Sequence, residues 1–245
     1  MPALKLVQSE TETGPTVATA SVSVIVPVYN ESGKVNEVVN RLLPLDCVSE
    51  VLVIDDGSSD GGVSAAADPS GDRLRVFRHE QNRGKGAAIR TGLANCRGDI
   101  VVIQDADLEY APEEIPRLVE PLLRLEADVV YGTRFGLGDR QQTPRERYLA
   151  NWLLTWLSNR FTGLSLTDME TGHKAFRRES IDEMKLCEDR FGFEPELTAR
   201  LAKLGCRIAE LPVSYTPRSY AEGKKIGVRD GLRALWCIVR YRYWN

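Results

Sequence analysis

The sequence predicts an α/β fold with a mainly parallel sheet and flanking helices. Short segments rich in Val and Ile alternate with segments whose apolar residues recur at helical spacing, which is the pattern of successive βαβ units. The strand segments are apolar almost throughout, as expected when helices cover both faces of a sheet. Several of them end in acidic residues, and in a parallel sheet such ends lie along one edge.

The expected elements follow one another along the chain. Short apolar runs predict strands at 23–29, 50–54, 74–78, 100–104 and 129–132. Helical spacing or a helix entry predicts helices at 35–43, 84–94, 112–125, 148–161 and 232–243. The 245 residues are 42% hydrophobic and 27% charged, which suits a single α/β domain.

Three regions are expected in this chain. Residues 1–20 are rich in Ser, Thr, Glu and Ala without periodicity and should form a mobile tail. Residues 21–215 would form the α/β domain. Residues 216–245 would add a basic loop and an amphipathic C-terminal helix.

Overall charge argues against a nucleic-acid partner, because the formal net charge is −3 at pH 7. The charge is unevenly spread, and residues 217–245 hold seven Lys or Arg against two acidic residues. A local anionic partner is therefore expected near the C-terminal end.

Cysteine and histidine usage indicates free thiols in a reducing compartment, without a zinc site. The five cysteines stand far apart, no Cys-x-x-Cys occurs, and only two histidines are present. We see no signal peptide and no apolar run of the roughly 18–20 residues that span a bilayer. We therefore expect a cytoplasmic protein, or one attached peripherally to the cytoplasmic face of the membrane.

The most informative stretch is 101–110, where an apolar strand runs into acids at alternate positions. Side chains two residues apart lie on one face of a strand. Asp105, Asp107 and Glu109 would thus present three oxygen donors together, the ligand type that Mg²⁺ or Mn²⁺ prefers. An isolated Asp-x-Asp would instead indicate a solvated acidic turn.

Two further strand ends would meet these acids at the same edge of the sheet. Tyr29 and Glu31 follow the first strand, and Asp55 ends the second. An aromatic ring, a lone carboxylate and a metal site together suit a base, a ribose and a diphosphate. Lys85, in the glycine-rich loop 83–86, would offset the charge of a phosphate that approaches the backbone.

Other nucleotide-binding signatures fail in this loop. A Walker A motif requires Ser or Thr after Gly-Lys, whereas Gly86 follows Lys85. The dinucleotide fingerprint would begin at Gly84 and end in Ile89 rather than glycine.

Four segments together resemble the inverting family 2 glycosyltransferases with the GT-A fold. They are 26–31, 53–58, 82–86 and 105–109, in the order and spacing of that family. A narrower likeness is to dolichyl-phosphate mannosyltransferases and bacterial polyprenyl-phosphate sugar transferases. It is carried by residues 132–134, 167–176 and 218–225. The resemblance implies a GT-A, Rossmann-like domain followed by C-terminal amphipathic helical elements.

The resemblance also implies roles for the matching positions. The nucleotide-sugar would be bound by Pro27, Tyr29, Glu31, Val53, Asp55, Lys85, Asp105, Ala106, Asp107, Arg218 and Lys224. The metal ion, Mg²⁺ or Mn²⁺, would be held by Asp105, Asp107 and Glu109. The catalytic residues would be Asp105, Asp107, Arg134, Arg147 and Asp168. The two arginines would grip an acceptor phosphate, a task that suits the planar guanidinium.

The implied reaction is a metal-dependent, inverting transfer of a hexose from GDP-mannose or a UDP-sugar to a polyprenyl or dolichyl phosphate. A phosphate acceptor is already anionic near neutral pH, so the reaction requires no general base. A soluble or saccharide hydroxyl acceptor is the alternative, and Asp168 or Glu170 would then be the base. Asp168 also has a structural alternative, which is to orient Arg134 or to cap a helix at 171–176. A binding module without turnover is a third hypothesis, which the intact acids oppose.

Two apolar helical stripes contain tryptophan, and the sequence does not determine which surface they contact. One contains Trp152 and Trp156, and the other contains Trp236. Packing against the core is the commoner use of such a stripe. A membrane interface favours Trp and Tyr beside Arg, and another subunit is a further alternative, so both peripheral membrane attachment and an oligomer are compatible with the sequence.

Overall fold

The computed structural model describes residues 20–61, 71–135, 145–182, 184–217 and 228–243 of the chain. The tail predicted at 1–20 lies outside the described residues except for Ala20, and so does most of the basic loop. The side chains of Arg147 and of residues 228–230 are also outside the description.

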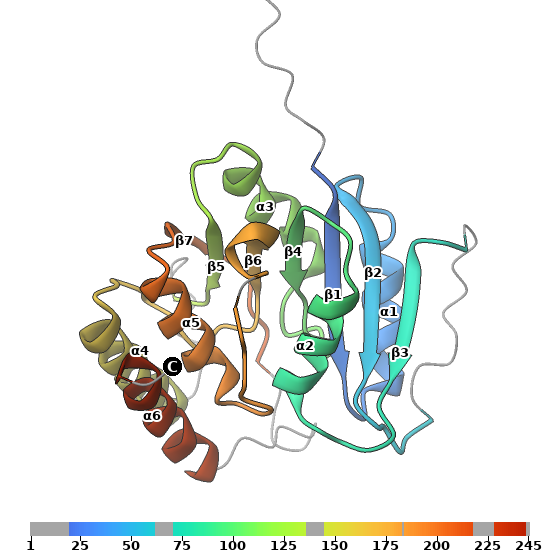
Figure 1. Ribbon diagram of the computed structural model, residues 1–245. Coiled ribbons are helices and arrows are strands. Elements are labelled where there is room, and N and C mark those ends of the chain that lie inside the picture. Colours follow the sequence, from blue (N-terminus) through green and yellow to red (C-terminus); the bar gives the residue numbers. More distant parts are fainter. Residues whose placement is uncertain (1–19, 62–70, 136–144, 183, 218–227, 244–245) are drawn as a thin grey trace, which may run out of the picture.

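One sheet forms the centre of the protein, with strand order β3-β2-β1-β4-β6-β5-β7 (Figure 1). Its strands are β1 (Val22–Val28), β2 (Val48–Asp55), β3 (Leu74–Arg78), β4 (Ile100–Ile103), β5 (Val129–Thr133), β6 (Lys174–Arg177) and β7 (Ile208–Pro212). Neighbouring strands are parallel except at β6, which is antiparallel to β4 and β5. The prediction of a mainly parallel α/β sheet is confirmed.

Helices cover both faces of this sheet (Figure 1). They are α1 (Ser32–Leu42), α2 (Lys85–Asn95), α3 (Ile115–Leu123), α4 (Arg145–Thr162), α5 (Phe193–Lys203) and α6 (Val228–Tyr243), with 3₁₀ turns η1 (Pro112–Glu114) and η3 (Arg178–Ser180). α1 and α3 pack on one face, and α2 and α5 on the other. α4 and α6 pack against α5 and against each other. No helix within the described ranges is long and apolar enough to cross a membrane.

The central strands β1, β2 and β4 are buried on both sides, because consecutive side chains face opposite layers. In β1, Val24 and Val26 belong to the apolar cluster under α1 and α3, whereas Ile25 belongs to the cluster under α2 and α5. All four residues of β4 are buried. This double cover explains the continuous apolar runs and leaves the ends of the strands for polar chemistry.

The second half of the chain contains β6, α5 and β7, which the sequence patterns do not predict. The helix considered at 171–176 is wrong, because residues 174–177 form β6 between β4 and β5. Lys174 is fully buried in this strand, 4.5 Å from the centroid of the Tyr131 ring, and is paired with Glu194 of α5. Charged residues at buried positions hide the apolar periodicity on which strand and helix predictions depend.

Gly92 allows α2 to lie close to β1, which gives a test of the packing. A Cβ at this position would lie 2.5 Å from Cγ2 of Ile25. We expect Gly92→Ala to lower the free energy of unfolding by about 1–3 kcal/mol, because the overlap must be relieved. Chemical denaturation measures this change. Gly231→Ala in α6 is the control, since its Cβ would meet nothing within 4 Å, and equal effects of both substitutions would contradict the close contact.

Candidate active site

The carboxyl ends of β1 and β2 form the first part of the candidate site. Val28 pairs with Asp55, so Tyr29 leaves β1 next to the end of β2. Asp55 is buried, and its Oδ1 accepts the backbone N–H of Ser58 at 2.9 Å while its Oδ2 lies 3.5 Å from Nε of Arg78. Tyr29 is 43% exposed. An accessible aromatic ring and a carboxylate are thus neighbours at this edge of the sheet.

Three other residues expected to bind the nucleoside lie in different surroundings. Pro27 and Glu31 are partly exposed near the same strand end. Val53, in contrast, is completely buried in the apolar cluster under α1 and α3. The side chain of Val53 therefore has no surface with which to contact a ligand.

The three acids after β4 do not share one strand face, and that expectation is wrong. β4 ends at Ile103, and Leu108 has a left-handed backbone conformation with φ of 61°, which breaks the alternation of a strand. Asp107 Oδ1 accepts the backbone N–H of Glu109 at 3.0 Å, as in an Asx turn. The Glu109 carboxylate is buried and accepts the hydroxyl hydrogen of Tyr215 at 3.0 Å. Glu109 thus holds the segment after β7.

No group of three or more His, Cys, Asp or Glu side chains suited to a metal ion occurs within the part of the chain that the structure describes. The expected triad is therefore not assembled. Mg²⁺ is nevertheless often bound by one or two carboxylates together with substrate phosphates. The Asp105 side chain is 21% exposed and Asp107 is partly exposed, with the buried Ala106 between them. These two carboxylates fit a metal ion whose coordination a bound diphosphate would complete.

Asp105 belongs to a chain of paired charges that joins four elements. Its Oδ1 lies 2.8 Å from Nζ of Lys85, at the start of α2. Nζ of Lys85 lies 3.5 Å from Oε1 of Glu194 in α5, and the other oxygen of Glu194 is paired with Lys174 in β6. Burial works against the charges, yet their attraction raises the pKa of Lys85 and lowers the pKa of Asp105.

Gly172 lets the backbone before β6 approach this chain of charges. A Cβ on Gly172 would overlap Oδ2 of Asp105 and lie 3.2 Å from Nζ of Lys85. The backbone N–H of Gly172 donates to the hydroxyl of Tyr110 at 3.2 Å, and the Tyr110 ring packs on that of Tyr215 with 5.3 Å between centroids. Tyr110 thus connects the acids after β4 to the segment after β7.

Arg134 follows β5 and is held by a buried acid. Its Nε and Nη2 donate to Oδ2 and Oδ1 of Asp168, both at 2.6 Å, which is bidentate geometry. Asp168 is completely buried and also accepts from Asn151 of α4 at 3.1 Å. The guanidinium lies 5.3 Å from the centroid of the Tyr215 ring. Burial opposes the charge of Arg134, but the attraction of Asp168 raises its pKa.

This pairing favours the structural alternative for Asp168, which is to orient Arg134. Both carboxylate oxygens are engaged, and the side chain has no exposed surface, whereas a base must reach its substrate. Arg147 lies on α4, four residues before Asn151. The side chain of Arg147 is outside the description.

Two titratable groups, the partly buried Glu170 and the fully buried His173, lie in the segment that leads into β6. Burial raises the pKa of Glu170 to about 7, and repulsion from Glu194 adds to the shift. Burial lowers the pKa of His173 to about 4. Among the described residues, Oε1 of Glu170 and both ring nitrogens of His173 have no hydrogen-bond partner. The His173 ring packs 5.4 Å from that of Tyr110.

The sequence did not reveal several residues that complete the site. Glu194 belongs to no recognisable motif, and its role depends on α5 meeting the start of α2. Asn151 lies 17 residues from Asp168, and Tyr215 lies 106 residues from Glu109, so neither contact follows from a local pattern. Arg218 and Lys224, expected to close over the donor, lie outside the described residues.

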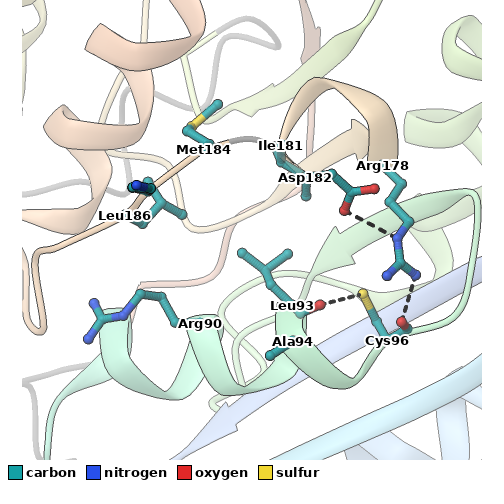
Figure 2. A pocket seen from close by; sticks show the side chains of 10 residues that line it. Arg90, Leu93, Ala94, Cys96, Arg178, Ile181, Asp182, Met184 and Leu186 are labelled. Carbon is teal, nitrogen blue, oxygen red and sulfur yellow. Dashed lines mark hydrogen bonds and ion pairs between the residues drawn. The ribbon is translucent and has the colours of Figure 1, made fainter. Parts of the chain in front are cut away.

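A cavity of about 450 Å³ lies away from these residues, between the C-terminal half of α2 and the segment after η3 (Figure 2). Arg178 at its wall donates to Asp182 and to the backbone oxygen of Cys96, and Arg90 donates to the backbone oxygen of Glu188. Both arginines are thus hydrogen-bonded within the protein. No residue of the predicted site lines this cavity, so the candidate active site is the sheet edge instead.

The pattern of glycosyl transferase family 2 matches residues 23–185, from β1 to beyond η3. The chain belongs to this family. The match includes the two strand ends, the Lys85 loop, the acids after β4, Arg134 and Asp168. The resemblance to family 2 glycosyltransferases is therefore confirmed.

Similar proteins include two transferases whose names specify undecaprenyl phosphate. The undecaprenyl-phosphate mannosyltransferase of Micrococcus luteus is 34% identical over 242 residues, which cover 89% of this chain and 97% of that protein. The undecaprenyl-phosphate 4-deoxy-4-formamido-L-arabinose transferase of Sodalis glossinidius is 35% identical over 210 residues. That alignment covers 83% of this chain but 62% of the relative, so the chain spans less than two thirds of its length.

The glucosyl-3-phosphoglycerate synthase of Mycobacterium tuberculosis is a similar solved structure, in complex with Mn²⁺, UDP and glucosyl-3-phosphoglycerate. The two structures superpose with a TM-score of 0.68 at 25% sequence identity. The alignment covers 97% of this chain and 88% of the synthase chain. The expected GT-A fold is confirmed.

The unpartnered His173 should make the protein less stable in mild acid. Because burial depresses its pKa from 6.5 to about 4, the unfolded chain binds a proton in this range that the folded protein does not. Stability is therefore lost as the pH falls from 6.5 towards 4, by up to about 3 kcal/mol at 1.36 kcal/mol per pKa unit.

Chemical denaturation of the wild type and of His173→Phe at pH 7.5 and pH 5 would measure this contribution. The wild type should lose more stability than the variant between the two pH values. The effect of Glu170, which has the opposite sign, is common to both proteins and cancels in the comparison. Equal losses would contradict the neutral, buried state of His173.

Proposed function

We propose that this protein transfers a hexose from a nucleotide-sugar to a polyprenyl phosphate, with inversion at the anomeric carbon. The observation that carries the proposal is that two ion pairs lie at the same edge of the sheet. The Asp105–Lys85 pair suits a diphosphate, and the bidentate Asp168–Arg134 pair suits a phosphate. Tyr110 interacts electrostatically with both Lys85 and Arg134. The similarity to two undecaprenyl-phosphate sugar transferases supports a lipid phosphate as acceptor.

The nucleotide-sugar would lie along the carboxyl ends of β1, β2 and β4. Tyr29 and Asp55 would contact the nucleoside, and Lys85 would offset charge on the diphosphate. Asp105 and Asp107 would hold Mg²⁺ or Mn²⁺, which stabilises the departing nucleoside diphosphate when bound. Mn²⁺ accompanies UDP in the similar synthase. GDP-mannose and UDP-sugars both remain within the proposal.

Arg134 would grip the acceptor phosphate, together with Arg147 of α4. The guanidinium is held in place by Asp168, so no ordering of this side chain is needed when the acceptor binds. An anionic phosphate oxygen needs no base, which agrees with the complete burial of Asp168. Arg218 and Lys224 are proposed to cover the donor.

A small phosphorylated acceptor with a hydroxyl nucleophile is the second candidate. The similar glucosyl-3-phosphoglycerate synthase, in complex with its product, favours it. Arg134 would then hold the acceptor phosphate, and a base would be required. Glu170, whose pKa is raised to about 7 by burial, is better suited to that role than the buried Asp168.

The first test incubates the protein with polyprenyl phosphate, Mg²⁺ or Mn²⁺ and a panel of GDP- and UDP-sugars. A glycolipid detected by mass spectrometry would name the donor. We expect Asp107→Asn to lower the rate on the order of 100-fold, because a metal ligand is weakened.

Glu109→Gln is the matched control, since its amide oxygen still accepts from Tyr215. It should retain activity within about threefold of the wild type. Equal losses of activity in both variants would indicate that Glu109 is a ligand of the metal ion. Transfer to 3-phosphoglycerate without any glycolipid would favour the second candidate, and nucleotide binding without turnover would indicate a binding module.

We further propose that α4 and α6 meet an anionic bilayer at the cytoplasmic face. Eight apolar side chains on these two helices are 36–64% exposed, and they are Leu149, Trp152, Leu153, Trp156, Leu232, Trp236, Val239 and Tyr243. The two helices touch through Phe161 and Tyr243, whose ring centroids are 6.3 Å apart. Arg145, Arg160 and Arg242 are exposed around this apolar face. Trp beside Arg suits the interface of an anionic membrane, and all five cysteines are free thiols, as in a reducing compartment.

Sedimentation with vesicles of phosphatidylglycerol and phosphatidylcholine tests this attachment. Replacing Trp152, Trp156 and Trp236 with Ala should lower the vesicle-bound fraction at least about tenfold, because three aromatic anchors are lost. The control replaces three exposed apolar residues elsewhere, Val76, Leu125 and Leu204, and should bind as the wild type does. A dimer that the tryptophan substitutions abolish would instead assign this face to a second subunit.

A further inference from the structure

Asp56 accepts four hydrogen bonds from the loop that precedes α2. Its Oδ1 lies 2.6 Å from Nδ1 of His79 and 2.9 Å from the backbone nitrogen of Arg83. Its Oδ2 accepts from Nδ2 of Asn82 at 3.0 Å and from the backbone N–H of Gly84 at 2.7 Å. An ionised carboxylate only accepts, so Nδ1 of His79 carries the hydrogen of that bond.

These four bonds leave Asp56 no capacity to bind a ligand. A carboxylate has about four lone-pair positions, and each oxygen of Asp56 already has two donors. Its neighbour Asp55 is equally buried but has different partners. It accepts one hydrogen bond from Ser58 and lies 3.5 Å from Nε of Arg78, at the strand end beside the accessible Tyr29. The two consecutive acids therefore have different tasks.

The loop held by Asp56 leads directly into Lys85. Gly84 is the N-cap residue of α2 and has φ of 106°, and Lys85 is the first residue of the helix. The bonds to residues 82–84 thus fix the three positions before the lysine that pairs with Asp105. Gly57 permits the close approach, since a Cβ there would lie 2.6 Å from the backbone of Gln81.

The same carboxylate also fixes the body of α2. Nε2 of His79 lies 2.9 Å from Oγ1 of Thr91, nearly two turns into the helix. His79 therefore spans from Asp56 to α2 while the loop bonds hold the start of the helix. On the other side, the backbone N–H of Ala87 donates to the oxygen of Asp189 at 3.1 Å. The helix that carries Lys85 is therefore held by hydrogen bonds on two sides, from His79 and from Asp189.

We propose that Asp56 is a positioning residue that aims Lys85 at the diphosphate of the donor, without touching the donor itself. The inference deepens the proposed function and rests on it, because it takes a nucleoside diphosphate as the group that Lys85 meets. A lysine side chain is flexible, so the positions that the ammonium group of Lys85 can reach depend on where the backbone of Lys85 is held. Asp56 links that point to the end of β2, next to the expected nucleoside site.

Titration calorimetry with GDP and UDP, in the presence of Mg²⁺, tests the inference without an acceptor. We expect Asp56→Asn to weaken binding of the nucleoside diphosphate about tenfold or more. The NH₂ group of the asparagine side chain would face hydrogen-bond donors, from which it cannot accept. Binding of GMP or UMP should weaken less, since the second phosphate is absent. Glu50→Gln is the matched control, a buried carboxylate at the opposite end of β2 that accepts from Ser23, Arg75 and Arg97.

A double-mutant cycle with Lys85→Met separates positioning from a general loss of stability. If Asp56 acts through Lys85, then Asp56→Asn should add little to the loss that Lys85→Met already causes. Additive losses, or equal effects of Asp56→Asn and Glu50→Gln on binding, would overturn the inference. Failure of the wild type to bind GDP or UDP would overturn the proposed function, and this inference with it.

Asn82→Ala provides a second variant if Asp56→Asn does not fold. It removes one of the four bonds and leaves the carboxylate in place. We expect severalfold weaker binding of the nucleoside diphosphate and faster hydrogen exchange at the amides of Arg83 and Gly84. Unchanged binding together with faster exchange would overturn the inference.

Discussion

Helices cover both faces of the sheet, so polar chemistry is confined to the ends of its strands, and the charges gathered there must pair with one another. Asp105, Lys85, Glu194 and Lys174 meet this constraint as an alternating chain. They come from the end of β4, from α2, from α5 and from β6, so the chain also ties these elements together. Its deepest pair, Lys174 and Glu194, is almost completely buried, and removal of one partner from such a pair typically costs about 3–5 kcal/mol.

The same constraint explains how Arg134 stands ready for an anion. Asp168 holds the guanidinium through two hydrogen bonds to Nε and Nη2, and Asn151 accepts a third from Nη2 and donates to Asp168. A cation held this way loses little side-chain entropy when a ligand arrives. The geometry therefore suits an acceptor that is already charged better than one that must first lose a proton.

Two helices connect the sheet edge to the surface. α4 directs Asn151 to Asp168 on its inner side and exposes Trp152 and Trp156 on its outer side. In α6, Arg233 and Tyr241 donate to the carboxylate of Glu188, and the following residue, Asp189, holds the start of α2. The helices that carry the proposed lipid-facing surface thus also reach Arg134, through Asn151, and the start of α2, through Glu188 and Asp189.

The sequence by itself determined the parallel α/β sheet and its first five strands. It also determined the strand end at Asp55, the helix start at Lys85 and the loop that contains Asp105. Short apolar runs and glycine-rich turns are local signals, and the topology of parallel strands brings their ends to one edge. The amphipathic stripes at 148–161 and 232–243 were local signals too, and they form α4 and α6.

Only the tertiary structure decided which charged groups meet. A positive φ at Leu108 turns Glu109 towards Tyr215 and away from a strand face, and no alternation pattern reveals such a turn. The elements β6 and α5 carry buried Lys174 and Glu194, whose burial is favourable because each has the other as partner. Residues distant in sequence supply that compensation, so the apolar pattern that marks a buried element was lost from the sequence.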